Sequence, residues 1–253
     1  MSFDSLYRDT DDDLSSQIVS LTFFRFHGFG TKLWAFGQMA LARRPLAMLP
    51  DHGFFKLMGG GTGEGFTPIP DTGLIAVLTT WPDLQTARQR TETAPVFQRL
   101  AHRATEVWTI HLSPVHSRGA WSRKMPFHEA PSNGSGPIAA LTRASIRPAI
   151  LFQFWRRVPD ISAAIGSDPN VLFKQGVGEV PWFHQVTFSV WPDTRSMAAF
   201  ARAGGPHAQA IRAVREGDWF SEELYARFAV VATAGSWGGA DPLAAYALTL
   251  AAE

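Results

Sequence analysis

Hydrophobic positions along the first half of the chain predict an alternating series of strands and helices. Alternating β-branched and aromatic residues predict strands over 18–24, 53–58, 74–81 and 106–112. Apolar residues at helical spacing predict helices over 32–49 and 83–103, the second interrupted at Pro95. The order is β-α-β-β-α-β, which is the pattern of a ferredoxin-like unit.

The same order of elements is predicted a second time later in the chain. Strands are predicted over 138–143, 171–175, 182–190 and 224–232, and helices over 150–165 and 206–216. Between the two series, Pro114, Pro126, Pro131 and the run Asn-Gly-Ser-Gly at 133–136 favour a linker. The pattern therefore predicts two ferredoxin-like units in tandem.

Matching residues recur between the two series at a nearly constant spacing, which indicates an internal repeat. The offset is 141 − 21 = 120 at the first strand and 191 − 81 = 110 after the third, because the intervening loop is longer in the first unit. Two such units would bury their open sheet faces against each other. The matched pairs are Leu21-Thr22 with Leu141-Thr142, Phe55-Lys56 with Phe173-Lys174, Trp81-Pro82-Asp83 with Trp191-Pro192-Asp193, Pro95 with Pro206, and Trp108 with Trp219.

These patterns predict an α+β fold, a tandem duplicated ferredoxin-like repeat of the dimeric α/β-barrel type within a single chain. Its segments are expected to be a flexible N-terminal tail at 1–16, a first repeat at 17–112, a linker at 113–136, a second repeat at 137–234 and a C-terminal tail at 235–253.

Composition and charge exclude several classes of function. The 23 basic and 22 acidic residues give a net charge of +1, so no electrostatic footprint for nucleic acid is present. Because the sequence contains no cysteine, disulfides, cysteine nucleophiles and thiolate-ligated haem are excluded. No stretch is long enough to cross a bilayer and no signal-peptide pattern begins the chain, so we expect a cytoplasmic protein.

Two histidines lie on faces that are predicted to be buried. Gly205-Pro206 predicts the start of a helix, on which His207 shares an apolar stripe with Ala210, Ile211 and Val214. The matching residue in the first unit is Val96, which suggests one working site and one structural counterpart. A core histidine bonded to a backbone carbonyl explains the pattern of His207 equally well. His184 shares a strand face with Val186, Phe188 and Val190, as either a core residue or a pocket group.

Several longer stretches resemble the spheroidene monooxygenase family, the acyclic carotenoid 2-ketolases. The similarity covers most of residues 18–245 and is more specific than any short motif. The stretches are Phe54–Gly59, Gly63–Pro68, Ala139–Ala144, Val158–Ser162, Phe173–Pro181, Gly205–His207, Ala210–Glu216 and Glu222–Phe228.

The resemblance implies a haem-dependent oxygenase that uses oxygen and electrons from reduced ferredoxin. Its substrates would be spheroidene-type linear carotenoids, and two oxidations at carbon 2 would give a keto group. The cofactor would be haem b, bound in the second repeat. We predict His207 as the axial ligand of its iron, with His184 as the second choice.

Cationic side chains complete the predicted site. Lys174 and Arg147 are candidates for binding the haem propionates, although ordinary carboxylate partners would serve a buried cation as well. Because no thiolate is available, cleavage of the oxygen–oxygen bond would need a distal donor, and Arg143 is our candidate catalytic residue.

A membrane-dissolved substrate implies transient contact with a membrane surface, peripheral at the inner or photosynthetic membrane. Trp34, Phe36, Met39 and Leu41 beside Arg43-Arg44 could make that contact, although a core helix with a basic end explains them as well. Two other functions stay open, a haem enzyme with dehydratase-like chemistry and a non-catalytic carrier of haem or carotenoid. A requirement for an electron donor, and turnover under oxygen, would separate these three.

Overall fold

The computed structural model describes residues 17–62, 69–132, 135–156, 170–202 and 219–246. The elements of the first half are β1 (Ile18–Arg25), α1 (Phe29–Leu41), α2 (Arg43–Ala47), β2 (Phe55–Gly61), β3 (Pro70–Trp81), α3 (Leu84–Thr93), α4 (Pro95–Ala101) and β4 (Glu106–Gly119). Those of the second half are β5 (Ile138–Ile146), the 3-10 turn η1 (Pro148–Ile150), a helical stretch at 151–156, β6 (Phe173–Gly178), β7 (His184–Trp191), α6 (Thr194–Arg202), β8 (Phe220–Gly235) and the 3-10 turn η2 (Ala244–Tyr246).

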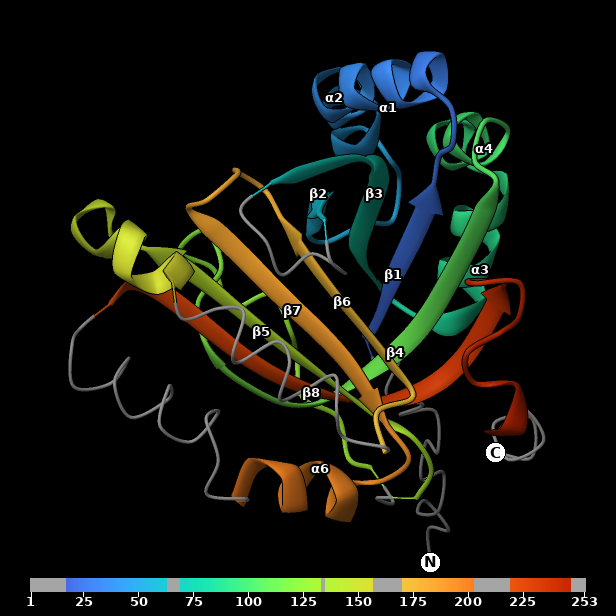
Figure 1. Ribbon diagram of the computed structural model, residues 1–253. Coiled ribbons are helices and arrows are strands. Elements are labelled where there is room, and N and C mark those ends of the chain that lie inside the picture. The colour runs from blue at the N-terminus through green and yellow to red at the C-terminus, as the bar shows by residue number, and fades with distance from the viewer. Residues whose placement is uncertain (1–16, 63–68, 133–134, 157–169, 203–218, 247–253) are drawn as a thin grey trace, which may run out of the picture.

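The strands form a closed antiparallel barrel in the order β1-β3-β2-β6-β7-β5-β8-β4 (Figure 1). Within it, the first half has the order β4-β1-β3-β2 and the second half has the matching order β8-β5-β7-β6. The predicted α+β class and the ferredoxin-like order of strands are therefore confirmed. Trp81 pairs with Ile18 at the start of β1, and Trp191 pairs with Ile138 at the start of β5, so these two tryptophans are equivalent.

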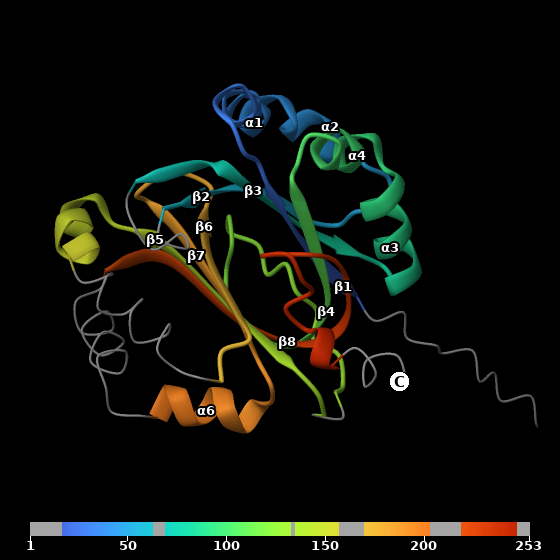
Figure 2. The ribbon, with the colours of Figure 1, turned by 45° about the vertical axis from the view of Figure 1, so that its right-hand side comes forward.

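Two hydrophobic cores hold the described structure together. Inward side chains fill the barrel with aromatic rings, and the Trp108 and Phe173 rings lie 4.5 Å apart. The outer face of the first-half sheet carries a second core, covered by α1 to α4 (Figure 2). Pro95 begins α4 after Ala94 in extended conformation, and Asp83 caps α3 by accepting a hydrogen bond from the Thr86 amide.

Two of the sequence matches between the halves are wrong in register. Phe55 pairs with Thr79, whereas Lys174 pairs with Ser189, so Phe55 corresponds to Lys174 and not to Phe173. A shift of one residue moves a side chain to the opposite face of a sheet, and Phe173 accordingly lies inside the barrel. Trp108 pairs with Phe23, and the equivalent pair in the second half is Arg143 with Leu224, so Trp219 is not its counterpart.

The predicted linker and C-terminal tail also differ from the structure. β4 continues through Ser113–Gly119, which pairs with β8 past a register shift at Pro114. Residues 235–246 pack on the barrel, and Leu243 is fully buried there. The predicted tail at 1–16 and the predicted helix at 206–216 lie outside the described residues.

A short Gly-x-Trp segment begins where the last strand of each half ends. Each of the two segments lies over its own end of the barrel. Gly119 and Gly235 have φ values of +97° and +85°, and an added Cβ would lie 2.2 and 2.1 Å from a backbone oxygen. Each glycine therefore allows a turn that other residues cannot make. The tryptophans that follow, Trp121 and Trp237, each pair with a residue three positions later, Lys124 and Ala240.

Candidate active site

The two halves meet along one short strand seam, between β2 and β6. These strands pair only at Gly59 with Gly178 and at Gly60 with Val177. An added Cβ at Gly60 would lie 2.4 Å from the side chain of Leu74 in β3, so the glycine leaves room for that side chain beside the seam. The opposite seam, between β4 and β8, extends from Trp108 to Gly119. Cavities open on both sides of the short seam.

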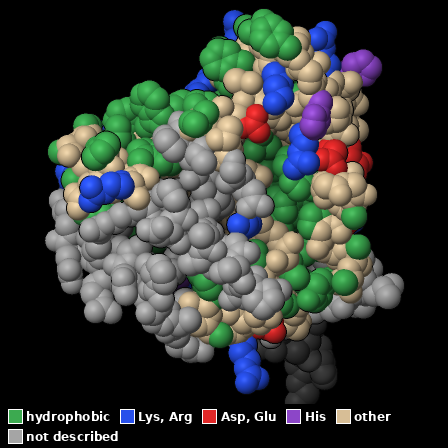
Figure 3. All heavy atoms as spheres, in the orientation of Figure 1, with side chains coloured by type: hydrophobic (Ala, Val, Ile, Leu, Met, Phe, Trp, Pro, Cys, Tyr) green, Lys and Arg blue, Asp and Glu red, His purple; other side chains and the backbone are tan. Residues whose placement is uncertain are grey.

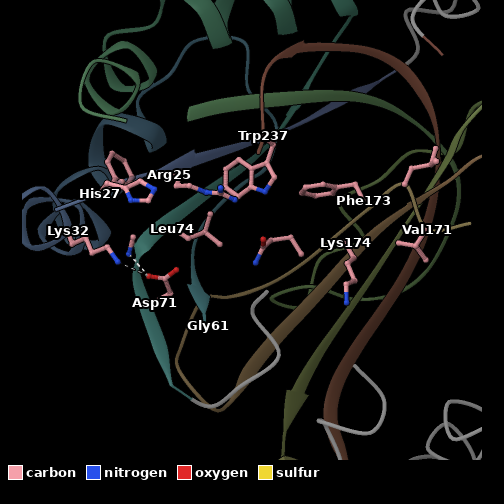
Figure 4. Close-up of a pocket in the computed structure, with 14 residues that line it drawn as sticks. Arg25, His27, Lys32, Gly61, Asp71, Leu74, Val171, Phe173, Lys174 and Trp237 are labelled. Atoms are coloured by element: carbon pink, nitrogen blue, oxygen red, sulfur yellow. Dashed lines mark hydrogen bonds and ion pairs between the residues drawn. The ribbon is translucent and has the colours of Figure 1, made fainter. Parts of the chain in front are cut away.

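The larger cavity has a volume of about 550 Å³ and opens at the end of the barrel near Trp237 (Figure 4). The Arg25 guanidinium lies 3.9 Å from the centre of the Trp237 ring and 2.8 Å from the Glu106 carboxylate. The Lys32 ammonium lies 3.7 Å from the Asp71 carboxylate across the mouth. The cavity is lined by Arg25, Phe26, His27, Lys32, Gly61, Asp71, Gly73, Leu74, Val171–Gln175 and Trp237.

The charges of this cavity suit a ligand with anionic groups and a flat apolar body. Three cations, Arg25, Lys32 and Lys174, line it, Arg25 paired with Glu106 and Lys32 with Asp71, and the Phe173 and Trp237 rings supply apolar surface. Its volume lies in the range of cofactor sites, about 300–1,000 Å³. No group of three or more His, Asp or Glu side chains that could hold a metal ion occurs within the described residues.

The smaller cavity, of about 180 Å³, lies between α1 and the turn that joins β6 to β7. Its walls include Phe36 and Met39 from α1 and Val180 and Trp182 from the turn, so most of its surface is apolar. Glu179, His184 and Gln185 supply polar groups. An apolar cavity with a few convergent polar groups is typical of a binding or active site.

Glu179 joins the smaller cavity to a buried polar cluster inside the barrel. Its Oε1 accepts a hydrogen bond from Lys56 Nζ at 2.6 Å, and its Oε2 accepts one from Trp121 Nε1, also at 2.6 Å. Arg143 lies 3.8 Å from the same Oε2 and donates a hydrogen bond to Glu222. The members of this cluster, which we call the barrel-end cluster, are Lys56, Trp121, Arg143, Glu179, His184 and Glu222.

The barrel-end cluster keeps its carboxylates ionised and its imidazole neutral. Burial would raise the pKa of Glu179, but the hydrogen bonds from Lys56 and Trp121 and the charge of Arg143 outweigh it, so the pKa falls below its ordinary value. Burial, followed by the charge of Arg143, lowers the pKa of His184. His184 Nδ1 is buried without a hydrogen-bond partner and lies 3.9 Å from Glu179 Oε2.

The structure separates the predicted site residues instead of bringing them together. Lys174 lines the larger cavity, whereas Arg147 follows the far end of β5, roughly 20 Å away at about 3.3 Å per residue. His184 lines the smaller cavity. Arg143 is 1% exposed and lines neither cavity. His207 lies outside the described residues.

Sequence reasoning missed the partners of the predicted residues. Lys56 reads from the sequence as a cation in an apolar strand, but its partner Glu179 lies 123 positions away. The sequence does indicate that Trp121 and Trp237 are equivalent, because Gly119-Ala120-Trp121 and Gly235-Ser236-Trp237 repeat at an offset of 235 − 119 = 116. His111 lies within the predicted strand over 106–112, and the structure shows that it is buried in β4.

Solved structures define the class of the fold. A crystal structure of aldoxime dehydratase matches with a TM-score of 0.59 at 10% identity, covering 87% of this chain and 83% of that one. A second aldoxime dehydratase, in complex with butyraldoxime, matches with a TM-score of 0.56. The protein therefore has a ferredoxin-like α+β-barrel fold of the kind found in aldoxime dehydratases. No family model matches the chain.

Curated relatives place the chain in one family within that class. It is 48% identical over 234 residues to the spheroidene monooxygenase of Rhodobacter capsulatus, covering 91% of this chain and 97% of the relative. It is also 48% identical over 229 residues to that of Cereibacter sphaeroides, covering 90% and 71%, and 31% identical over 208 residues to that of Rubrivivax gelatinosus, covering 82% and 80%. The chain belongs to the spheroidene monooxygenase family and is a monooxygenase.

Proposed function

We propose that the protein oxidises spheroidene-type linear carotenoids at carbon 2 and leaves a keto group there. The observation that carries this proposal is the 48% identity to two spheroidene monooxygenases over about nine tenths of the chain. The smaller cavity supports it, because an apolar space with Glu179 and His184 among its lining residues suits one end of a long polyene.

The proposed reaction is two successive hydroxylations of one carbon. In each, one atom of O₂ enters a C–H bond and the other leaves as water, with two electrons and two protons consumed. The second hydroxylation gives a geminal diol, which loses water to leave the ketone. Reduced ferredoxin is the proposed electron donor, and the protein would work in the cytoplasm at the surface of the membrane that holds the carotenoid.

Haem b is the proposed cofactor, and when bound it would supply the oxygen-activating iron. Support comes from the larger cavity, in which Arg25, Lys32 and Lys174 suit the two carboxylates of a haem, and Phe173 and Trp237 suit its ring. His207 is the residue that we propose would hold the haem iron. If His184, the second choice, held it instead, the haem would lie at the smaller cavity, which His184 lines. Lys174 would contact a haem carboxylate in the larger cavity, whereas Arg147, beyond the far end of β5 and roughly 20 Å away at about 3.3 Å per residue, would not reach that cavity.

The barrel-end cluster would position groups at the smaller cavity. Glu179 is held by Lys56 and Trp121, and it in turn faces His184 Nδ1. A neutral His184 would take up a proton at Nδ1 and pass it on, which suits a reaction that consumes two protons in each hydroxylation. Arg143 reaches the smaller cavity only through Glu179, so we assign it a positioning role in place of the distal donor that the sequence suggested.

We also propose that the two halves arose by tandem duplication of one ferredoxin-like unit. The shared strand order, the equivalence of Trp81 with Trp191 and the two Gly-x-Trp segments support this proposal.

The reaction is tested with haem-loaded protein, spheroidene, oxygen and reduced ferredoxin. We expect a product with a keto group at carbon 2, and none when oxygen or ferredoxin is left out. Product formed equally well without oxygen would contradict an oxygenase. Turnover that needs no electron donor would favour dehydratase-like chemistry, and haem binding without any turnover would favour a carrier.

The ligand of the iron is tested with His207→Ala and His184→Ala as a matched pair. We expect the His207→Ala protein to lose haem and to change the ferrous–CO spectrum, while the His184→Ala protein keeps both. The reverse result would assign the iron to His184.

A further inference from the structure

The outer face of α1 exposes large apolar side chains that no described residue covers. Phe29 is 86% exposed, and Leu33 and Phe36 are each 61% exposed. Their spacing of i, i+4 and i+7 places them on one side of the helix, opposite the buried Gln38. Trp34 and Met39, which the sequence suggested for a surface contact, instead pack partly against the outer core.

A second exposed apolar group lies across the mouth of the smaller cavity. Val180 and Trp182, in the turn after β6, are 42% and 49% exposed. The Trp182 carbonyl accepts a hydrogen bond from Trp155 Nε1 at 3.1 Å, which fixes the turn against the helical stretch at 151–156. Figure 3 shows hydrophobic side chains gathered at the top of the view, over α1, and at its upper left.

The smaller cavity connects these two groups into one surface. Phe36 from α1 and both Val180 and Trp182 from the turn line that cavity, so its mouth is bordered by apolar side chains on both sides. We name Phe29, Leu33, Phe36, Val180 and Trp182 the apolar rim. Exposed patches of this kind mark sites of contact with proteins or membranes.

The charged residues of the α1–α2 segment that carries most of the apolar rim are all basic, and Asp71 of β3 pairs with one of them, Lys32. Residues 26–50 contain Lys32, Arg43 and Arg44 and no Asp or Glu. Arg43 also lines the smaller cavity. An amphipathic helix with apolar residues on one face and cations beside them suits the interface of an anionic bilayer, and tryptophan favours the same depth. A twofold contact of this face with a second copy would bring the two basic borders close together.

We propose that the apolar rim seats on an anionic lipid bilayer, with Arg43 and Arg44 at the headgroups, so that the smaller cavity opens directly onto lipid. The inference deepens the proposed function, on which it rests for the identity of what passes through the opening. An apolar substrate would then move from the bilayer into the cavity without crossing water. No helix within the described part of the chain has the length and apolar character needed to cross a membrane.

The test measures binding to vesicles of phosphatidylcholine with phosphatidylglycerol, compared with phosphatidylcholine alone, by sedimentation. Phe29→Ser and Leu33→Ser change rim residues that do not line the cavity. We expect each to weaken binding roughly tenfold or more, because each removes apolar surface that the bilayer would bury. Arg43→Gln and Arg44→Gln should each weaken it about fivefold, on anionic vesicles only.

Tyr225→Ser is the matched control, because Tyr225 is 40% exposed on β8, on the opposite side of the barrel from the short seam. It should bind vesicles like the unchanged protein. Unaltered vesicle binding by the combined Phe29→Ser/Leu33→Ser variant would overturn the proposal. So would a dimer in light scattering that this variant converts to monomer, because a second copy would then be the occupant.

Turnover separates failure of the docking surface from failure of the proposed function. The Phe29→Ser/Leu33→Ser variant should oxidise detergent-dispersed carotenoid at the unchanged rate and lose turnover only with carotenoid in vesicles. Vesicle binding by a protein that oxidises no carotenoid would keep the docking surface and reject the function. Equal turnover from vesicles by the variant would keep the function and reject the surface.

Discussion

At the scale of single residues, His111 is a buried imidazole whose surroundings keep it uncharged. It is 2% exposed within β4, and neither ring nitrogen has a hydrogen-bond partner. Burial, followed by the charge of Arg88, lowers its pKa from 6.5 to about 4. The folded protein therefore holds a neutral histidine over a range of pH in which an unfolded chain would protonate it.

His111 should make the protein less stable in mild acid. As the pH falls from 6.5 to about 4, the unfolded chain binds a proton that the folded protein does not, so stability present above pH 6.5 is lost across this window. The loss is roughly 3 kcal/mol at about 1.4 kcal/mol per pH unit. His111→Phe should remove that part of the pH dependence, measured by urea unfolding at several pH values. Its control is His116→Phe, at an exposed position. Equal slopes for His111→Phe and the unchanged protein would contradict the assignment.

The sequence marks individual buried charges but not their partners. Lys56 and Lys174 both stand in apolar strands, and the requirement for an anionic partner follows from that alone. Only the three-dimensional fold brings Glu179 to Lys56. The same limit applies to His184, which is only half-buried although the face of Val186 and Phe188 predicted burial, and whose position beside Glu179 depends on the β6–β7 turn.

At the scale of elements, the two Gly-x-Trp segments turn the chain from the last strand of each half onto a barrel end. Trp121 is completely buried and donates to Glu179, whereas Trp237 is only partly buried and lines the larger cavity. Equivalent segments thus close one barrel end tightly and leave space at the other.

Gly119→Ala and Gly235→Ala should each destabilise the protein strongly. Each Cβ would meet a backbone oxygen at 2.2 or 2.1 Å, in addition to the strain of a positive φ. We expect a loss of about 3 kcal/mol or more in the free energy of unfolding, measured by chemical denaturation. Gly136→Ala is the control, because its φ is +78° with nothing within 4 Å, and it should cost only about 1–2 kcal/mol. Similar losses at all three positions would show that the contacts with backbone oxygen do not matter.

Element order was predictable from periodicity, but the ends of elements were not. Pro114 and the polar residues after it favour a linker, yet they continue β4, because the ladder shifts register between Pro114 and His116. A proline is tolerated in a strand at such a bulge. The dipeptide Phe-Lys occurs at Phe55-Lys56 and again at Phe173-Lys174, so the sequence alone matches Phe55 with Phe173. Strand pairing instead makes Phe55 equivalent to Lys174, because register and not residue identity sets the face on which a side chain lies.

At the scale of the whole molecule, the two halves are joined by unequal seams. The long seam continues from Trp108 to Gly119, while the short seam has two residue pairs, beside a register shift between Gly59 and Gly60. The two described cavities lie along the short seam, where least pairing has to be interrupted for a ligand to enter.

Hydrogen exchange should detect this difference between the seams. Amides at 57–61 and 174–178 should exchange roughly tenfold faster, or more, than amides within 108–119 and 224–234, because short pairing and glycines lower the free energy of local opening. Mass spectrometry of the exchanged peptides would measure it, and the amides of β1, which is paired on both sides, provide an internal reference. Equal protection at both seams would contradict the prediction.

The long seam also has a consequence for how the chain is made. Among the described strands β8 leaves the ribosome last, yet it supplies one whole edge of the pairing for β4 and for β5. Until it emerges, the aromatic inner face of the first half, including Phe23 and Trp108, has no complete barrel to enclose it. Nascent chains that stall before residue 220 would expose that face to solvent and to one another. Biosynthesis of this protein should therefore depend strongly on chaperones that shield a chain in which β8 has not yet emerged, and truncation just before β8 should yield aggregates in place of a smaller folded domain.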